Sequence, residues 1–207
     1  MGNNREAKRA ALKERLVDAA EELIAHNGLR GLKARDITAK AGCALGALYN
    51  AVEGLDELLV LVNSRTRNRS GAQSLSAFPA DLDAERRMHA LGAVYARFAV
   101  ENANLWSALF THRLPEGQMS PDWHRAEFNT LIQQIAAPLS QLCPGFDQQT
   151  LTLRAQTMFA AVHGVVHLSI HGFEVGAPAE QLLSEVDALV GAMVRGLRSD
   201  EKSAVIT

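Results

Sequence analysis

Three histidines, His163, His167 and His171, carry the side chains of this sequence best suited to metal chemistry. They recur every fourth residue, so one face of a helix would present all three imidazoles to a divalent metal ion. Metal-assisted hydrolysis is the enzymatic hypothesis, but the sequence has no HExxH motif and no evident nucleophile or base partner. A structural role, or a hydrogen bond to a ligand, is favoured over metal binding. We predict no catalytic residue and no cofactor.

A second feature is a tight corner between two short apolar segments, ITAKAGCALGALYNAVEGLDELL, residues 37–59. Helical spacing continues on both sides of Gly42-Cys43-Ala44, and Gly42 supplies the backbone freedom that a turn needs. Two short helices joined in this way form a helix-turn-helix, whose second helix can enter a major groove of DNA. On this pattern alone, the corner could equally be the top of any helical bundle.

Charge is distributed unevenly along the 207 residues. Residues 1–52 carry nine Lys and Arg against six Asp and Glu, whereas the rest carries twelve against seventeen. A basic segment on an acidic body has the sign expected for binding nucleic acid.

Two cysteines, Cys43 and Cys143, are too few for a disulfide framework, and neither a secretion signal nor an apolar run long enough for a membrane is evident. We expect a cytoplasmic protein without a membrane partner.

Apolar residues recur at three- and four-residue spacing throughout the segments that must position these residues. We therefore predict an all-α fold of about nine helices. The polar run at residues 63–70 is expected to form a solvated face, and residues 71–83 a linker. Pro138 should kink a helix and Pro178 should lie in the first turn of the last helix. The predicted helices cover approximately residues 5–26, 33–41, 45–52, 55–70, 84–103, 105–112, 122–142, 147–174 and 178–198.

The segment from Leu16 to Leu59 resembles the DNA-binding head of the TetR family of transcriptional regulators. That head carries the pattern A-G-x-S-x-G-x-L-Y-x-x-F-x-x-K-x-x-L. The matching residues are Ala41, Gly42, Gly46, Leu48, Tyr49 and Leu58, preceded by Arg35-Asp36-Ile37. The sequence departs from the pattern at Ala44, Ala47, Val52 and Leu55, which removes a helix cap and one phosphate-binding lysine.

The resemblance implies which residues contact DNA. Tyr49 should touch phosphate, Lys33 and Arg35 should approach the backbone or groove edge, and Asn50 is the only amide on the second helix of the corner. Because this helix is poor in hydrogen-bonding groups, DNA shape and an N-terminal arm in a minor groove should contribute to recognition. The predicted DNA-binding residues are Lys33, Arg35, Ala44, Leu45, Gly46, Ala47, Tyr49 and Asn50.

The remainder resembles TetR-like regulators whose C-terminal domain is named for a Trp-His-Gly motif. His163-Gly164 fits this motif, and Phe159 stands near the place of the missing Trp. The resemblance implies a small-molecule effector, and plain core packing is the alternative for each residue that would line its pocket. The predicted ligand-binding residues are Trp106, Phe110, Trp123, Phe128, Met158, Phe159, His163 and His167.

The last predicted helix carries an apolar surface wider than one packing stripe needs, including Leu189 and Met193, and the preceding helix has small residues such as Ala160 and Gly164. Two helices from each chain are therefore expected to form a homodimer interface.

Together these features predict a homodimeric regulator, a repressor released from operator DNA by a small-molecule effector. Residues 1–52 would form the DNA-binding domain and residues 53–207 the ligand-binding and dimerisation domain. A nonspecific DNA-binding or adaptor protein is the alternative, and it would show little preference for an operator over random duplex.

Overall fold

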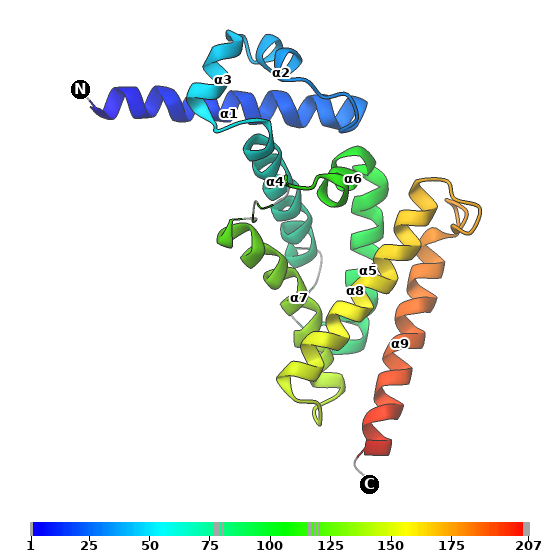
Figure 1. The fold of residues 1–207 in the computed structure, drawn as a ribbon. Helices are drawn as coiled ribbons and strands as arrows, with labels where there is room; N and C mark the ends of the chain where they lie inside the picture. Colours follow the sequence, from blue (N-terminus) through cyan, green and yellow to red (C-terminus); the bar gives the residue numbers. More distant parts are fainter. Residues whose placement is uncertain are drawn as a thin grey trace. The chain divides into compact units, whose positions relative to one another are not determined.

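The fold is all helical, as predicted. The computed structural model describes residues 2–76, 79, 81–115, 117, 119 and 121–204, and within these ranges it contains nine helices and no strand (Figure 1). Among the described residues, no helix is sufficiently long and apolar to span a lipid bilayer. The chain divides into two compact units, Met1–Arg69 with Asn102–His124, and Ser70–Glu101 with Arg125–Thr207.

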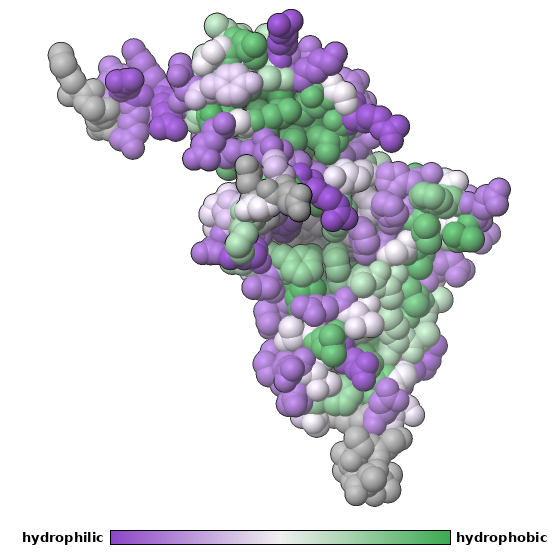
Figure 2. Space-filling model, in the orientation of Figure 1, coloured by the Kyte–Doolittle hydropathy of each residue, from purple (hydrophilic) through white to green (hydrophobic). Residues whose placement is uncertain are grey.

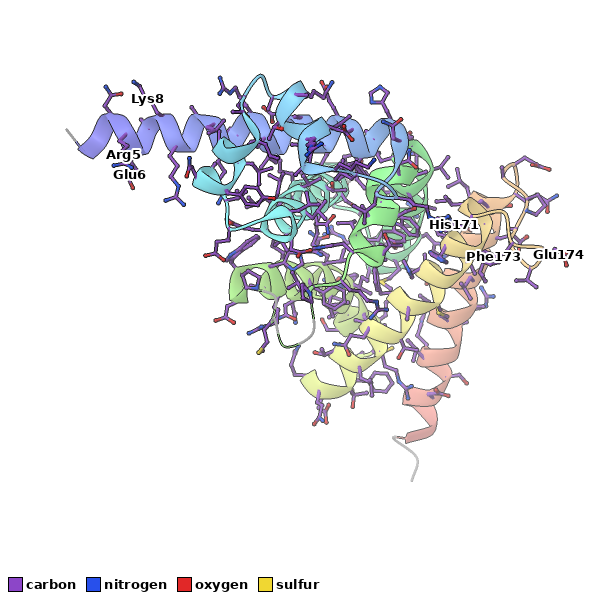
Figure 3. The ribbon with its side chains drawn as sticks, turned by 45° about the horizontal axis from the view of Figure 1, so that its top comes forward. Arg5, Glu6, Lys8, His171, Phe173 and Glu174 are labelled. Carbon is purple, nitrogen blue, oxygen red and sulfur yellow. The ribbon has the colours of Figure 1, made fainter. Side chains whose placement is uncertain are left out.

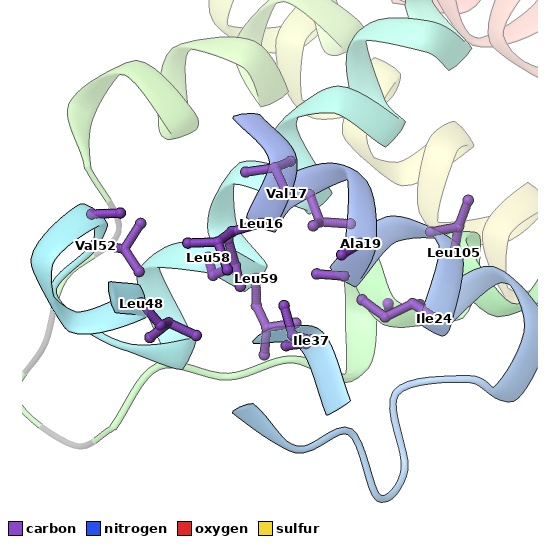
Figure 4. Close-up of a cluster of buried hydrophobic side chains, with 14 residues drawn as sticks. Leu16, Val17, Ala19, Ile24, Ile37, Leu48, Val52, Leu58, Leu59 and Leu105 are labelled. Atoms are coloured by element: carbon purple, nitrogen blue, oxygen red, sulfur yellow. The ribbon is translucent and has the colours of Figure 1, made fainter. Parts of the chain in front are cut away.

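The first unit surrounds α1 (Gly2–Asn27), which packs against α2 (Ala34–Lys40), α3 (Leu45–Ala51) and α6 (Ala103–Thr111). Leu16, Ala20 and Ile24 recur every four residues along α1 and are fully buried, so one stripe of this helix forms the centre of the core (Figure 4). Residues of α4 (Leu55–Ser76) and α6 complete this core. The unit that contains the predicted head therefore extends beyond residue 52.

The second unit contains α5 (Ala84–Glu101), α8 (Gln148–Ile170) and α9 (Leu182–Ala204), which pack against one another, together with most of α7 (Asp122–Leu142). α9 buries Val186, Val190 and Val194 at four-residue spacing. Gly92 of α5 lies opposite this stripe, where an added Cβ would be 3.0 Å from Val190. A glycine at this position therefore allows α5 and α9 to approach closely.

Three local predictions differ from the structure. α4 continues through Gly71 to Ser76, so the predicted linker begins inside a helix, which a single glycine weakens by only about 1 kcal/mol. α8 ends at Ile170, before residue 174, because Gly172 adopts φ +68° and the Phe173 N–H donates to the Leu168 carbonyl. Pro178 precedes α9 in a turn closed by the Gln181 N–H, and the helix begins only at Leu182.

Candidate functional site

The corner between α2 and α3 is closed by a Schellman motif. Gly42 adopts φ +66°, its N–H donates to the Ala39 carbonyl, and the Cys43 N–H donates to the Thr38 carbonyl. A residue with a side chain is strained in this left-handed conformation, whereas glycine is not. The glycine identified in the sequence is therefore the residue that turns the chain from one short helix into the next.

α3 has one buried and one exposed face. Leu48 and Ala51 are buried in the core of the first unit, whereas Tyr49 is 59% exposed and the neighbouring Asn50 is also exposed. The corner brings all eight predicted DNA-binding residues together, with Ala47 half-buried and the other seven exposed. Their role in DNA binding remains a prediction, but their side chains lie where such contacts are possible.

The first turn of α3 lacks a side-chain cap. Ala44 occupies the N-cap position with extended backbone angles, and no side chain accepts a hydrogen bond from the first turn of the helix. The Ala44→Ser variant should raise the free energy of unfolding by about 0.5–2 kcal/mol, because a hydroxyl at this position accepts from an N–H of the helix. Denaturant unfolding of the two proteins measures this difference, and an unchanged midpoint would show that solvent already satisfies the helix end.

A basic hollow of about 630 Å³ lies beside α3 and was missed by the sequence analysis. Its lining combines Asn50 with residues from the first turns of α1, namely Arg5, Glu6, Lys8, Arg9 and Leu12. Arg5, Glu6 and Lys8 lie on the end of α1 that projects beyond α3 (Figure 3), and this end is hydrophilic on the face drawn in Figure 2. The predicted N-terminal arm is helical from Gly2. The crowding of basic residues was visible in the sequence, but their place beside Asn50 depends on the packing of α1 on α3.

The polar part of α4 is bound to α1 by ion pairs. Arg65 pairs with Glu14 and Asp18, and Arg69 pairs with Glu21. The predicted solvated face at residues 63–70 is wrong for Asn63 and Thr66, which are buried, and the Thr66 hydroxyl is satisfied there because it donates to the Val62 carbonyl. One residue before Glu14 on α1, Lys13 pairs with Glu57 at 2.6 Å. Burial raises the pKa of Glu57, but hydrogen bonds from Lys13 and from the Glu53 N–H lower it more, so this carboxyl stays ionised below its usual range.

The second unit contains an apolar cavity of about 50 Å³. Met158 and Phe159, two of the predicted ligand-binding residues, line it together with Tyr95 and Gln134. Three of the five methionines of the chain, Met88, Met158 and Met193, contribute to the wall. Methionine side chains repack readily, so this wall can adapt to an occupant.

A row of aromatic and imidazole rings follows one face of α8. Phe159 stacks on His163 with ring centroids 5.9 Å apart, and His163, His167 and His171 continue at 5.7 and 4.5 Å. The Tyr95 hydroxyl lies 2.8 Å from His163 Nδ1. Within the described part of the chain, no group of three or more His, Cys, Asp or Glu side chains is placed to hold a metal ion. The geometry favours the hydrogen-bonding role for His163.

The pKa of His163 lies well below its ordinary value. Burial, and to a smaller extent the neighbouring His167, lowers it from 6.5 to about 4. At a pH between these two values, His163 is protonated in the unfolded chain but neutral in the folded protein. The free energy of unfolding is therefore highest above pH 6.5 and decreases as the pH falls toward 4.

We therefore expect the unfolding midpoint to fall on acidification, with His163 accounting for about 1–2 kcal/mol after screening by solvent. The His163→Gln variant cannot take up this proton and should show a shallower dependence on pH in the same interval. Thermal unfolding across a pH series compares the two, and parallel curves would contradict the assignment.

The other predicted ligand-binding residues lie outside the lining of this cavity. Trp106 and Phe110 belong to the first unit, where Trp106 is fully buried and the two rings are 5.1 Å apart. Trp123 also belongs to the first unit and is 45% exposed. The Phe128 and Phe159 rings meet edge to face, with ring centroids 5.9 Å apart. The His167 ring is tilted to the His163 ring, meets the His171 ring edge to face, and stacks on Phe173.

Comparison with known proteins identifies the family. Residues 88–197, more than half of the chain, match the family described as Tetracyclin repressor-like, C-terminal domain. A protein with unknown function from Rhodococcus sp. RHA1 has a similar structure, with a TM-score of 0.72 and 21% identity over 90% of this chain and 95% of that protein. The comparison with curated proteins gave no match.

Two further structures of the same fold contain a bound ligand or bound DNA. RolR in complex with resorcinol has a TM-score of 0.67 and 17% identity over 96% of this chain and 94% of RolR. BioQ with its natural double-stranded DNA operator has a TM-score of 0.63 and 17% identity over 88% of this chain and 98% of BioQ. With its all-helical fold, its helix-turn-helix corner and its matching C-terminal region, the chain belongs to the TetR family of transcriptional regulators.

Proposed function

We propose that the protein is a homodimeric repressor that binds two-fold operator DNA and is released by a small-molecule effector. The observation that carries the DNA-binding part is the exposed face of α3 with Tyr49 and Asn50, of which Asn50 lines the basic hollow together with Arg5, Lys8 and Arg9. Asn50 offers an amide to a base edge, and the cations offer contacts to phosphate. The DNA complex of BioQ, a protein of the same fold, supports this assignment.

The proposed dimer uses the outer face of α9. Ala188, Ala192 and Gly196 are exposed and recur every four residues, and an added Cβ at Gly196 or at Gly164 of α8 would meet no atom within 4 Å. A stripe of small residues allows a helix of a second copy to approach closely. Leu183, at the start of the same helix, is 41% exposed and offers apolar surface to such a partner.

The effector would act through α4. This helix is shared by the two units, because the boundary falls after Arg69, and Ser70 lines the cavity of the second unit. In the part of α4 that belongs to the first unit, Arg65 and Arg69 form ion pairs with acidic residues of α1. An effector that favours a second position of α4 would therefore change the position of α1, and with it the affinity for DNA. The ligand-bound structure of RolR supports an effector role for the second unit.

The DNA-binding assignment is tested by selecting bound duplexes from a random pool and measuring the affinity of the selected duplex by fluorescence anisotropy. Arg35→Ala should weaken binding about tenfold, because this exposed cation in the first turn of α2 would contact the DNA backbone or groove edge. Arg86→Ala, which removes an exposed cation of the second unit, is the matched control and should leave the affinity unchanged. Selection that enriches no sequence would favour the nonspecific DNA-binding alternative.

A further inference from the structure

One residue in the wall of the apolar cavity carries a buried amide oxygen. Gln134 of α7 lines the cavity, and its Oε1 has almost no accessible surface and accepts no hydrogen bond from any described residue, so an occupant reaches this oxygen when the wall moves aside. A buried acceptor without a donor destabilises the folded protein, so a side chain of this kind is retained at a cost. A ligand that brings a donor to this oxygen would recover that cost on binding.

The rest of the wall excludes charge. None of the described residues that line the cavity is an Asp, Glu, Lys, Arg or His. The hydroxyl of Tyr95, which also lines the cavity, lies within hydrogen-bond distance of His163 Nδ1. Burial keeps the pKa of that histidine far below neutrality, so the neighbouring imidazole supplies no positive charge to an anion. A carboxylate or an ammonium would lose its hydration here without meeting a side chain of opposite charge.

The cavity is also small. It measures about 50 Å³, whereas an engineered apolar cavity that binds benzene measures about 150 Å³. Met88, Met158 and Met193 form part of the wall, and their unbranched side chains can move aside for an occupant. A single ring is therefore the size of ligand that this wall can admit by side-chain movement alone.

We propose that the cavity takes a compact, uncharged, single-ring ligand whose hydroxyl donates to Gln134 Oε1, with the ring between Phe159 and the methionines. This inference rests on the proposed function in one respect, namely that the ligand acts as the effector. Binding of the ligand to the second unit does not depend on that role. Gln134 then determines specificity. It separates ligands that donate a hydrogen bond from ligands of the same shape that cannot.

The test is calorimetric titration of the full chain, without DNA and near neutral pH, with phenol, anisole and benzoate. Phenol should bind about tenfold more tightly than anisole, because only phenol satisfies the buried oxygen, and benzoate should not bind because it is charged. Equal affinities for phenol and anisole, failure of phenol to bind at millimolar concentration, or tight binding of benzoate would overturn the proposal.

The Gln134→Met variant provides the second arm. It replaces the amide by an apolar group of similar size, so it should bind phenol and anisole equally and should unfold about 2–4 °C higher without ligand. Gln133→Met, at the exposed neighbouring position of α7, should keep both the preference and the midpoint. A lower unfolding midpoint in Gln134→Met would contradict an unpaired oxygen.

A further measurement separates ligand binding from release of DNA, so that a failure of one can be told from a failure of the other. Phenol is added to the complex of the protein with its selected duplex, and anisotropy follows release. If the wild-type protein discriminates phenol from anisole through Gln134 but retains DNA, the inference on ligand chemistry stands and the effector part of the proposed function is wrong.

Discussion

Ala192→Glu should convert the protein to a monomer and weaken operator binding at least about a hundredfold. Ala192 is exposed in the middle of the small-residue stripe of α9, so a glutamate is accommodated in the monomer but places two like charges together in the proposed dimer. A dimer binds two half-sites at once, and loss of the second contact removes the gain in avidity, typically 10² to 10⁴-fold. Sedimentation velocity measures the assembly state and anisotropy the affinity.

The control for this experiment is Ala137→Glu, which adds the same charge at an exposed position of α7. It should leave both assembly and affinity unchanged. A dimeric Ala192→Glu protein with full affinity would show that the interface lies elsewhere, and a monomeric wild-type protein would exclude the dimer altogether.

Replacing Arg5, Lys8 and Arg9 together by alanine should weaken operator binding about a hundredfold at about 150 mM salt. These cations line the hollow together with Asn50, and Arg5 and Lys8 lie on the end of α1 that projects beyond α3. Each phosphate contact contributes about 0.9 to the slope of log affinity against log salt concentration, so the slope should decrease by about 2.7. A salt titration by anisotropy gives both quantities.

An equal loss of charge elsewhere controls for the general electrostatic attraction between protein and DNA. Arg86, Arg125 and Arg154 are exposed residues of the second unit, and their replacement by alanine should change the slope by less than about 1. If both triple variants change the slope equally, the first turns of α1 have no special role in DNA binding.

The corner could be predicted from the sequence because its signals are local. Gly42 marks the turn, and the four-residue spacing of Leu48 and Val52, both buried, identifies the inward side, which leaves Tyr49 and Asn50 on the other side. The resemblance to the TetR family then assigned a role to this outer face. All these features lie within fifteen residues of one another, so no long-range contact was needed.

The features that were missed depend on contacts between distant residues. Arg65 lies 47 residues from Asp18 and 51 from Glu14, so nothing in the local sequence distinguishes an ion-paired arginine from a solvated one. The pairing of Tyr95 with His163 spans 68 residues. Gln134 is an ordinary helical glutamine in the sequence, and its place in the wall of a cavity that α5, α8 and α9 also line becomes evident only from the packing of these helices.

Hydroxyl-radical footprinting on the selected duplex tests the central claim most directly, since that claim is that two copies of α3 engage one duplex. The protein should protect two half-sites related by a two-fold axis, centred about 10 base pairs or a multiple of this apart. Asn50→Ala should weaken the protection of both half-sites to the same extent. Protection of a single unsymmetrical site, or a footprint that Asn50→Ala leaves unchanged, would contradict the account.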